Sequence, residues 1–262
     1  MKHFFLILWG LLLDFLGSLL FVPLRAGVMV REFFTGRRCI LTKPKNPLGK
    51  GAVVLVHGAN MDRWCMFVLK RRLLKDGWGP VYDFELGPLN WTIEENAQML
   101  KKSCEEIEMH QKESGRPRGI NFIAHSMGGL VARYLVQALN QGASPLQIEN
   151  FITLGTPHWG TPVARLAFSR AGRQMIPGDP FLQRLNATEP CLPRGLNACF
   201  LWGDLDFLVP ARWASWGKRL AQPPTFRCLP YHGHMSMLLT KRAYREVRAV
   251  LAPARSLIAV GA

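Results

Sequence analysis

The sequence predicts an α/β protein with a mostly parallel central sheet and helices on both faces. From about residue 51, short apolar segments alternate with longer segments in which apolar residues recur every three or four positions. This is the pattern of strands alternating with helices. Residues 52–56 are apolar throughout, as expected of a central parallel strand buried on both faces. The chain has 262 residues, and its first forty differ in composition from the rest, so the remainder suits one domain better than two.

The elements of the domain follow from this alternation. Strands are expected at 52–56, 81–86, 121–124, 148–154, 198–202 and 225–229. Helices are expected in a stretch ending near residue 75, from 92 to about 114, over 130–139, and from about 240 to 251. Thr92 and Glu95 stand three residues apart in front of the second of these helices, which predicts a capping box.

The chain is therefore divided into an N-terminal anchor helix with a basic flank (1–40), a linker (41–50), the α/β domain (51–252) and a C-terminal tail (253–262). Within the domain, residues 160–196 lose the alternation and gather prolines and glycines. This composition predicts either a cap or lid over the site or an irregular region packed on the sheet edge.

Residues 4–22 form an apolar run with a single charge, Asp14. Their apolar side chains, at about −0.3 to −0.6 kcal/mol each, outweigh roughly +3 kcal/mol for the aspartate, so the segment is expected to insert as a single-pass anchor. A cleaved signal peptide is the alternative, but no good cleavage site follows. Four arginines between residues 25 and 38 favour a cytoplasmic domain, whereas a secreted or periplasmic domain needs the opposite orientation. The side of the membrane stays open.

The formal charge of +15 raises the question of a nucleic-acid partner. The basic residues are scattered and no nucleic-acid module is present, so we expect no such partner. Anionic lipid headgroups fit better beside the apolar N-terminus; a basic surface without a partner is the plain alternative.

The six cysteines show no metal-ligand spacing. Cys191 and Cys199 suit either a disulfide or two small core residues.

Polar residues follow four of the predicted strands, where ligands bind in open α/β sheets. They are His57-Gly58, Ser126, Asp204 or Asp206, and His232 or His234. A serine nucleophile needs a base to accept its proton, and the base needs an acid to orient it. Ser126 stands between a strand and a helix in the sequence Ala124-His125-Ser126-Met127-Gly128. This is a variant, with alanine first, of the Gly-x-Ser-x-Gly nucleophile elbow.

On these residues the chain, from about residue 51 to 251, resembles the α/β-hydrolase fold of serine lipases and esterases. The elbow resembles that of small bacterial lipases. Residues 153–161, Thr-Leu-Gly-Thr-Pro-His-Trp-Gly-Thr, are typical of relatives of bacterial triacylglycerol lipases. The order serine, aspartate, histidine is that of the fold.

The resemblance implies that Ser126 is the nucleophile. Asp206, which precedes a short apolar run, is favoured as the acid over Asp204, a candidate turn residue. His234, after a glycine and before a helix, is favoured as the base over His232, which is expected to line the entrance.

The backbone N–H groups of Ala59 and Met127 are implied as the oxyanion hole. The other histidines are interpreted as structural: His57 orders its loop, His125 packs beside the elbow and His158 ends its strand. No metal and no cofactor is expected.

The resemblance and the anchor together predict a membrane-anchored serine hydrolase that cleaves carboxylic esters, with lipid or acyl esters as substrates. The same three residues suit an acyltransferase with a drier pocket. A catalytically inactive hydrolase fold that serves as a binding protein is the alternative from another class.

Overall fold

The computed structural model describes residues 6–12, 14–16, 49–115, 119–139, 146–187, 192–193, 195–215 and 223–251. Its centre is a six-stranded, all-parallel sheet in the order β2-β1-β3-β4-β5-β6. The strands are β1 (Ala52–Val56), β2 (Val81–Phe84), β3 (Ile120–His125), β4 (Ile148–Leu154), β5 (Asn197–Gly203) and β6 (Thr225–Leu229). The predicted α/β class and parallel sheet are confirmed.

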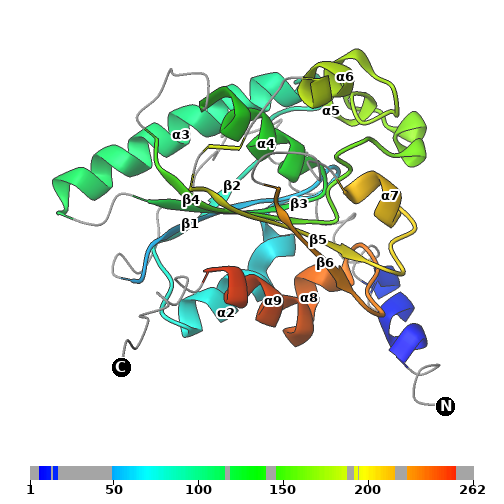
Figure 1. Ribbon diagram of the computed structural model, residues 1–262, viewed down its shortest axis with the longest axis horizontal. Helices are drawn as coiled ribbons and strands as arrows, with labels where there is room; N and C mark the ends of the chain where they lie inside the picture. Colours follow the sequence, from blue (N-terminus) through cyan, green and yellow to red (C-terminus); the bar gives the residue numbers. More distant parts are fainter. Residues whose placement is uncertain are drawn as a thin grey trace, which may run out of the picture.

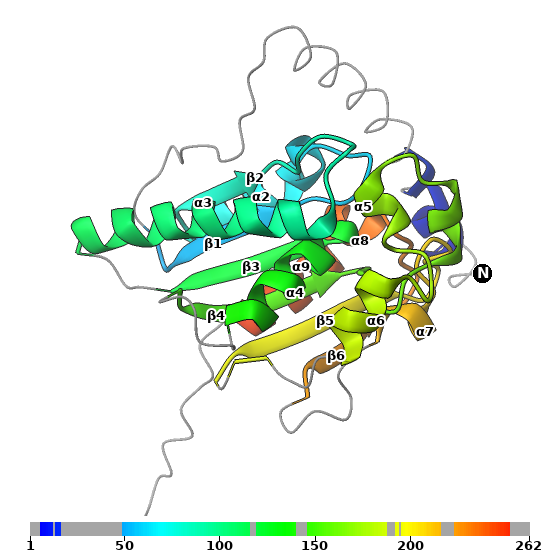
Figure 2. The ribbon, with the colours of Figure 1, turned by 90° about the horizontal axis from the view of Figure 1, so that it is seen from above.

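Helices cover both faces of the sheet (Figure 1). One face carries α3 (Ile93–Glu113) and α4 (Met127–Leu139), together with the short helices α5 (Arg170–Arg173) and α6 (Pro180–Ala187). The other face carries α2 (Phe67–Lys75), α8 (Ser236–Leu239) and α9 (Lys241–Leu251). The domain also holds the 3₁₀ turns η1 (Arg63–Met66) and η2 (Pro162–Leu166) and the helix α7 (Ala211–Ala214). Seen from above, α3 runs almost the length of the sheet (Figure 2).

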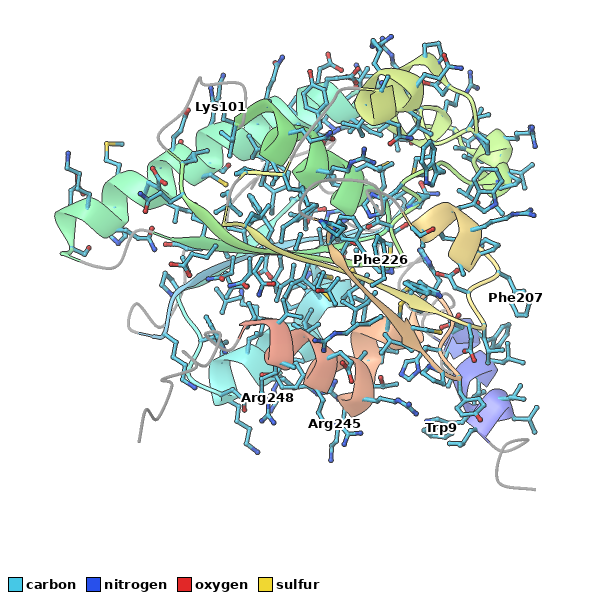
Figure 3. All side chains as sticks on the ribbon, viewed as in Figure 1. Trp9, Lys101, Phe207, Phe226, Arg245 and Arg248 are labelled. Carbon is cyan, nitrogen blue, oxygen red and sulfur yellow. The ribbon has the colours of Figure 1, made fainter. Side chains whose placement is uncertain are left out.

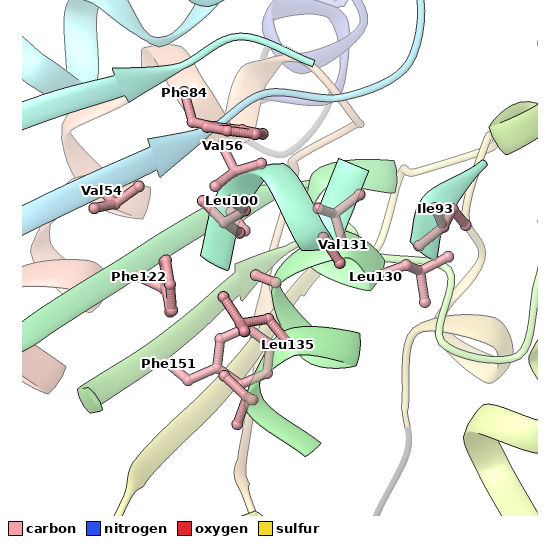
Figure 4. Close-up of a cluster of buried hydrophobic side chains, with 14 of the residues drawn as sticks. Val54, Val56, Phe84, Ile93, Leu100, Phe122, Leu130, Val131, Leu135 and Phe151 are labelled. Atoms are coloured by element: carbon pink, nitrogen blue, oxygen red, sulfur yellow. The ribbon is translucent and has the colours of Figure 1, made fainter. Parts of the chain in front are cut away.

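Two hydrophobic clusters lie on opposite faces of the sheet because successive side chains of a strand point to opposite sides. Val54 and Phe122 belong to the cluster under α3 and α4 (Figure 4), and Val53 and Ile123 belong to the other. The α9 helix closes the second cluster with one face, while Arg245 on its other face points away from the domain (Figure 3).

Local sequence signals agree with the observed boundaries. The Thr92 hydroxyl accepts the Glu95 N–H at 3.1 Å, and the Glu95 carboxylate accepts the Thr92 N–H at 2.6 Å, so the capping box is present. The β2 strand ends at Phe84, two residues before the predicted end. Residues 160–196 hold η2, α5 and α6 rather than one irregular loop.

The expected N-terminal anchor is described only in part. Residues 6–12 and 14–16 are helical, and this segment lies beside the β6 and α8 end of the domain (Figure 1). Within the described ranges, no helix combines the length and apolar character needed to cross a bilayer. Residues 17–48, which include most of the predicted linker, and the tail 253–262 lie outside the described residues. The spanning anchor is thus not supported by the structure and stays a prediction.

Candidate active site

The site lies where the strand order reverses. The chain leaves β1 toward β2 on one side and returns to β3 on the other, so a crevice forms outside the carboxyl ends of β1 and β3. Val56 pairs with Ala124 in the sheet, which brings His57-Gly58 beside His125-Ser126. A Cβ at position 58 would lie 2.9 Å from the Ser126 Cβ. Gly58 therefore allows the β1 loop to contact the serine.

Ser126 stands in a tight turn between β3 and α4. Its φ of 52° is in the left-handed region that L-residues rarely adopt. A Cβ at position 128 would lie 2.3 Å from the His57 carbonyl oxygen, and one at position 129 would lie 1.9 Å from the Thr156 Oγ1. Both glycines are required by close packing, whereas Ala124 is accommodated in the buried strand β3. The turn has the geometry of a nucleophile elbow.

Asp206 and His234 form a buried hydrogen-bonded pair. The His234 Nδ1–H donates to the Asp206 Oδ2 at 2.8 Å. The other Asp206 oxygen accepts the N–H groups of Leu208 and Val209 at 3.0 and 2.8 Å, which fix the carboxylate. Gly155 lies against the pair, since a Cβ there would be 3.1 Å from both bonded atoms.

Asp204 has a different role. Its Oδ1 accepts the N–H groups of Tyr231 and His232 at 2.6 and 3.3 Å. It therefore holds the turn that precedes His234, and the structure brings Asp206, not Asp204, to the imidazole.

The environment of His234 shifts the pKa of its imidazole ring. Burial disfavours the imidazolium, but the negative charge of Asp206, its hydrogen bond and the charge of Asp14 outweigh burial, so the pKa of His234 is raised above its ordinary value. The His125 ring lies 4.5 Å from the His234 ring, centroid to centroid, and its Nε2–H donates to the His234 carbonyl oxygen at 3.0 Å. Burial keeps the pKa of His125 well below its ordinary value. His125 thus acts as a neutral support between β3 and the histidine loop.

Ala59 and Met127 line one cavity of about 230 Å³. Met127 is the first residue of α4, where a backbone N–H has no acceptor within the helix. Apolar side chains, among them Leu86, Leu89 and Phe168, form much of the remaining wall. The cavity is therefore suited to an apolar group.

Two histidines differ from expectation. His232 was expected to line the entrance, but it is buried, with Nδ1 2.8 Å from the Pro230 carbonyl oxygen and Nε2 2.7 Å from the Thr240 hydroxyl. His158 was expected to end its strand, but β4 ends at Leu154 and His158 is fully buried, stacked on Phe200 at 4.3 Å between ring centroids. Its ring packs into the core because the chain turns back after the strand.

His57 supports the floor of the cavity. Its Nδ1–H donates to the Gly58 carbonyl oxygen at 2.8 Å, and its Nε2 lies 3.0 Å from a Glu85 carboxylate oxygen.

Among the described residues, no group of three or more His, Cys, Asp or Glu side chains is arranged to hold a metal. Cys199 is a free, buried thiol of β5, and Cys191 lies outside the described residues.

The segment 160–187 packs over one side of the cavity. The N–H groups of Arg170 and Ala171 donate to the carbonyl oxygens of Leu89 and Trp91 at 2.8 and 3.0 Å. Phe168 lines the cavity while 90% of its surface is exposed. The sequence predicts either a cap or an irregular region packed on the sheet edge over residues 160–196. It does not single out Phe168, because a lone aromatic residue in a region without periodicity carries no signal.

Asp14 is the residue near the site that sequence analysis missed. It was counted there only as a charge opposing membrane insertion. In the structure its carboxylate binds the backbone next to His234. The one signal in the sequence was the presence of a charge in an otherwise apolar run.

Solved structures with this fold include a lipase from Bacillus licheniformis, with a TM-score of 0.60 and 19% identity over 80% of this chain and 94% of that chain. A monoacylglycerol lipase from Paleococcus ferrophilus has a TM-score of 0.59 and 16% identity over 80% and 96%. A bacterial membrane phospholipase A has a TM-score of 0.55 and 16% identity over 96% and 98%. Identities this low show the shared fold alone. Among curated proteins, none matches the sequence.

The parallel sheet and its structural neighbours show that the chain has the α/β-hydrolase fold. More specifically, it belongs to the palmitoyl protein thioesterase family, whose model matches residues 52–186. The chain is a carboxylic ester hydrolase.

Proposed function

We propose that the chain cleaves acyl esters through a covalent acyl-enzyme on Ser126. The Ser126 Oγ attacks the ester carbonyl carbon while His234 Nε2 accepts the hydroxyl proton. Asp206 stabilises the resulting imidazolium through Nδ1–H. The oxyanion accepts hydrogen bonds from the N–H groups of Ala59 and Met127. The intermediate then collapses, and His234 returns the proton to the leaving alcohol.

Deacylation follows the same route in reverse. Water attacks the acyl carbonyl carbon and gives its proton to His234, and the Ser126 oxygen leaves with that proton. The observation that carries the proposal is the 2.8 Å hydrogen bond between His234 and Asp206. It supports the assigned roles because the paired ring lies 4.5 Å, centroid to centroid, from the tilted ring of His125, the neighbour of Ser126 at the end of β3.

The cavity supports an apolar acyl group as the substrate moiety. Its volume of about 230 Å³ is below the roughly 300–1,000 Å³ of typical ligand pockets. The enclosed space therefore suits a short or medium acyl chain, with a longer chain passing the exposed Phe168. The description of the family adds an acyl thioester as a candidate, since the same attack on a carbonyl carbon cleaves both bonds.

A lipid surface is the proposed source of the substrate. Leu166, Phe168 and Phe207 have 76%, 90% and 73% of their surfaces exposed, and the chain carries a net charge of +15. Apolar side chains together with basic charge favour an anionic membrane. The likeness to a membrane phospholipase A supports the same proposal at the level of the fold.

The test is turnover of p-nitrophenyl esters of increasing acyl length, and of a matching acyl thioester, by the full chain. We expect Ser126→Ala to abolish turnover and Ser114→Ala, at the far end of α3, to retain it. An added acceptor alcohol would reveal acyl transfer as a new ester product. Equal rates for the parent and Ser126→Ala, or no turnover of any substrate by the parent, would contradict the proposal.

A further inference from the structure

The N-terminal helical segment contacts the catalytic domain through a narrow stripe. This stripe holds one buried residue, Gly10, and two half-buried residues, Ile7 and Asp14. They are spaced three and four positions apart and therefore lie on one face of the helix. The apolar side chains on its other faces are exposed: Leu6, Leu8, Trp9, Leu11, Leu12, Phe15 and Leu16. Figure 3 shows Trp9 projecting from the segment, away from the domain. The side of the helix that faces the domain is therefore its least apolar side.

The contact is centred on the loop that carries His234. The Asp14 Oδ1 accepts the N–H groups of Met235 and Ser236 at 2.9 and 2.7 Å. These N–H groups belong to the two residues that follow the histidine. Hydrogen bonds from backbone N–H groups to an ionised carboxylate are stronger than those between neutral groups, so this contact restrains the loop more firmly than a neutral acceptor would.

Two glycines make the contact possible. A Cβ at position 233 would lie 1.7 Å from the Asp14 Oδ2, and a Cβ at position 10 would lie 2.4 Å from the Tyr231 carbonyl oxygen. Glycine at both positions allows the helix and the loop to approach each other. The glycine before His234 thus has a local role that the family motif alone does not explain.

We infer that Asp14 is a positioning residue for His234 and ties the N-terminal helix to the active site. Three contacts then hold His234 and the residues that follow it: Asp206 binds the ring, His125 binds the carbonyl of His234, and Asp14 binds the next two N–H groups. The inference rests on the proposed role of His234 as the base. It also gives the lone charge of the apolar segment a partner on the catalytic domain.

The position of Asp14 has an electrostatic consequence. Within the part of the chain that the structure describes, the titratable groups that face His234 are Asp206, His125 and Asp14, and His232 lies two residues before it. The charge of Asp14 helps raise the pKa of His234. Burial raises the pKa of Asp14 itself, against the backbone hydrogen bonds and the attraction of His234, which lower it.

Activity of the full chain against pH tests the inference. Asp14→Asn keeps an acceptor oxygen but removes the charge, so we expect kcat near that of the parent and an acid limb of kcat/KM shifted to lower pH. Asp14→Leu removes the acceptor as well, and kcat should fall by roughly tenfold to a hundredfold because the base is misplaced. Phe15→Leu, on the exposed face, is the matched control and should behave as the parent.

Gly10→Leu tests the contact between the N-terminal helix and the histidine loop by a second substitution. It leaves Asp14 intact but blocks the approach of the helix to Tyr231, so its kcat should fall as in Asp14→Leu. If Asp14→Leu and Gly10→Leu both keep the kcat and pH profile of the parent, the inference is wrong.

Hydrogen exchange separates this inference from the proposed function. The amides of Met235 and Ser236 should exchange faster in Asp14→Leu than in the parent or in Phe15→Leu, whatever the activity. Unchanged exchange would overturn the contact itself. If the parent shows no turnover that depends on Ser126, the proposed function is wrong. The exchange rates of the Met235 and Ser236 amides then still test the contact with Asp14.

Discussion

Asp204 and Asp206 lie in one turn after β5, and only Asp206 reaches the imidazole of His234. The turn directs the Asp206 side chain toward His234, while Asp204 binds the backbone of the next loop. Both functions need an oxygen acceptor, but only the first stabilises a developing positive charge. The two residues therefore form a matched pair for mutation.

Asp206→Asn should lower kcat by roughly 10⁴-fold, because the imidazolium loses its counter-charge and the ring its preferred tautomer. Asp204→Asn keeps the acceptor of its turn and should retain most of the activity. Steady-state turnover of one p-nitrophenyl ester measures both. Similar losses in the two variants would contradict the assignment of the acid.

The pH dependence follows from His234. The base must be neutral to accept the Ser126 proton, and its pKa lies above the ordinary value of 6.5. Activity is therefore present at higher pH and lost as pH falls through the pKa of His234. We expect the acid limb of kcat/KM to have its midpoint above 6.5. A midpoint below that value would show that the charges of Asp206 and Asp14 do not outweigh burial.

The roles of Ser126, Asp206 and His234 could be proposed from sequence because each follows a strand and stands in a recognisable local pattern. His125 and Asp14 could not, because their contacts with the His234 loop join residues 109 and more than 220 positions apart. Only the fold brings such residues together. His232, expected at the entrance, lies buried against Thr240, a contact only eight positions along the chain that no sequence pattern marks.

At the scale of elements, strands and long helices were predictable, and the short helices α5 and α6 were not. The strand β1 is a continuous apolar run rich in valine, and α3 is long and capped, so both carry strong local signals. The helices α5 and α6 have four and eight residues, too few for a clear period. Their positions depend on contacts with the loop before α3 and with α4.

The segment 160–187 yields a test of substrate binding. Phe168→Ala should raise KM for long-chain esters by about threefold to tenfold, since roughly 0.8 kcal/mol is lost for each methylene no longer shielded. Stability should change little, because Phe168 is 90% exposed. Leu166→Ala is the control, since Leu166 is exposed but is not among the residues of the cavity wall. Equal KM changes in both variants, or none in either, would exclude Phe168 from acyl binding.

At the scale of the whole molecule, the parallel sheet brings the polar residues that follow its strands to one edge. The net charge of +15 attracts anionic surfaces. The full chain should bind vesicles with anionic lipid more strongly than neutral vesicles, by about 1 kcal/mol for each Lys or Arg near the surface. Added salt should weaken this binding. Cosedimentation measures both effects, and binding that is independent of lipid charge and salt would contradict the electrostatic part of the proposal.

The acyl-enzyme on Ser126 is the central claim, and active-site labelling tests it most directly. The full chain is treated with a fluorophosphonate, which reacts with an activated serine, and the modified peptide is located by mass spectrometry. We predict one adduct, on Ser126, that forms in the parent and in Asp204→Asn but is lost in His234→Ala. An adduct on another residue, or an unmodified Ser126 in the folded parent, would contradict the account.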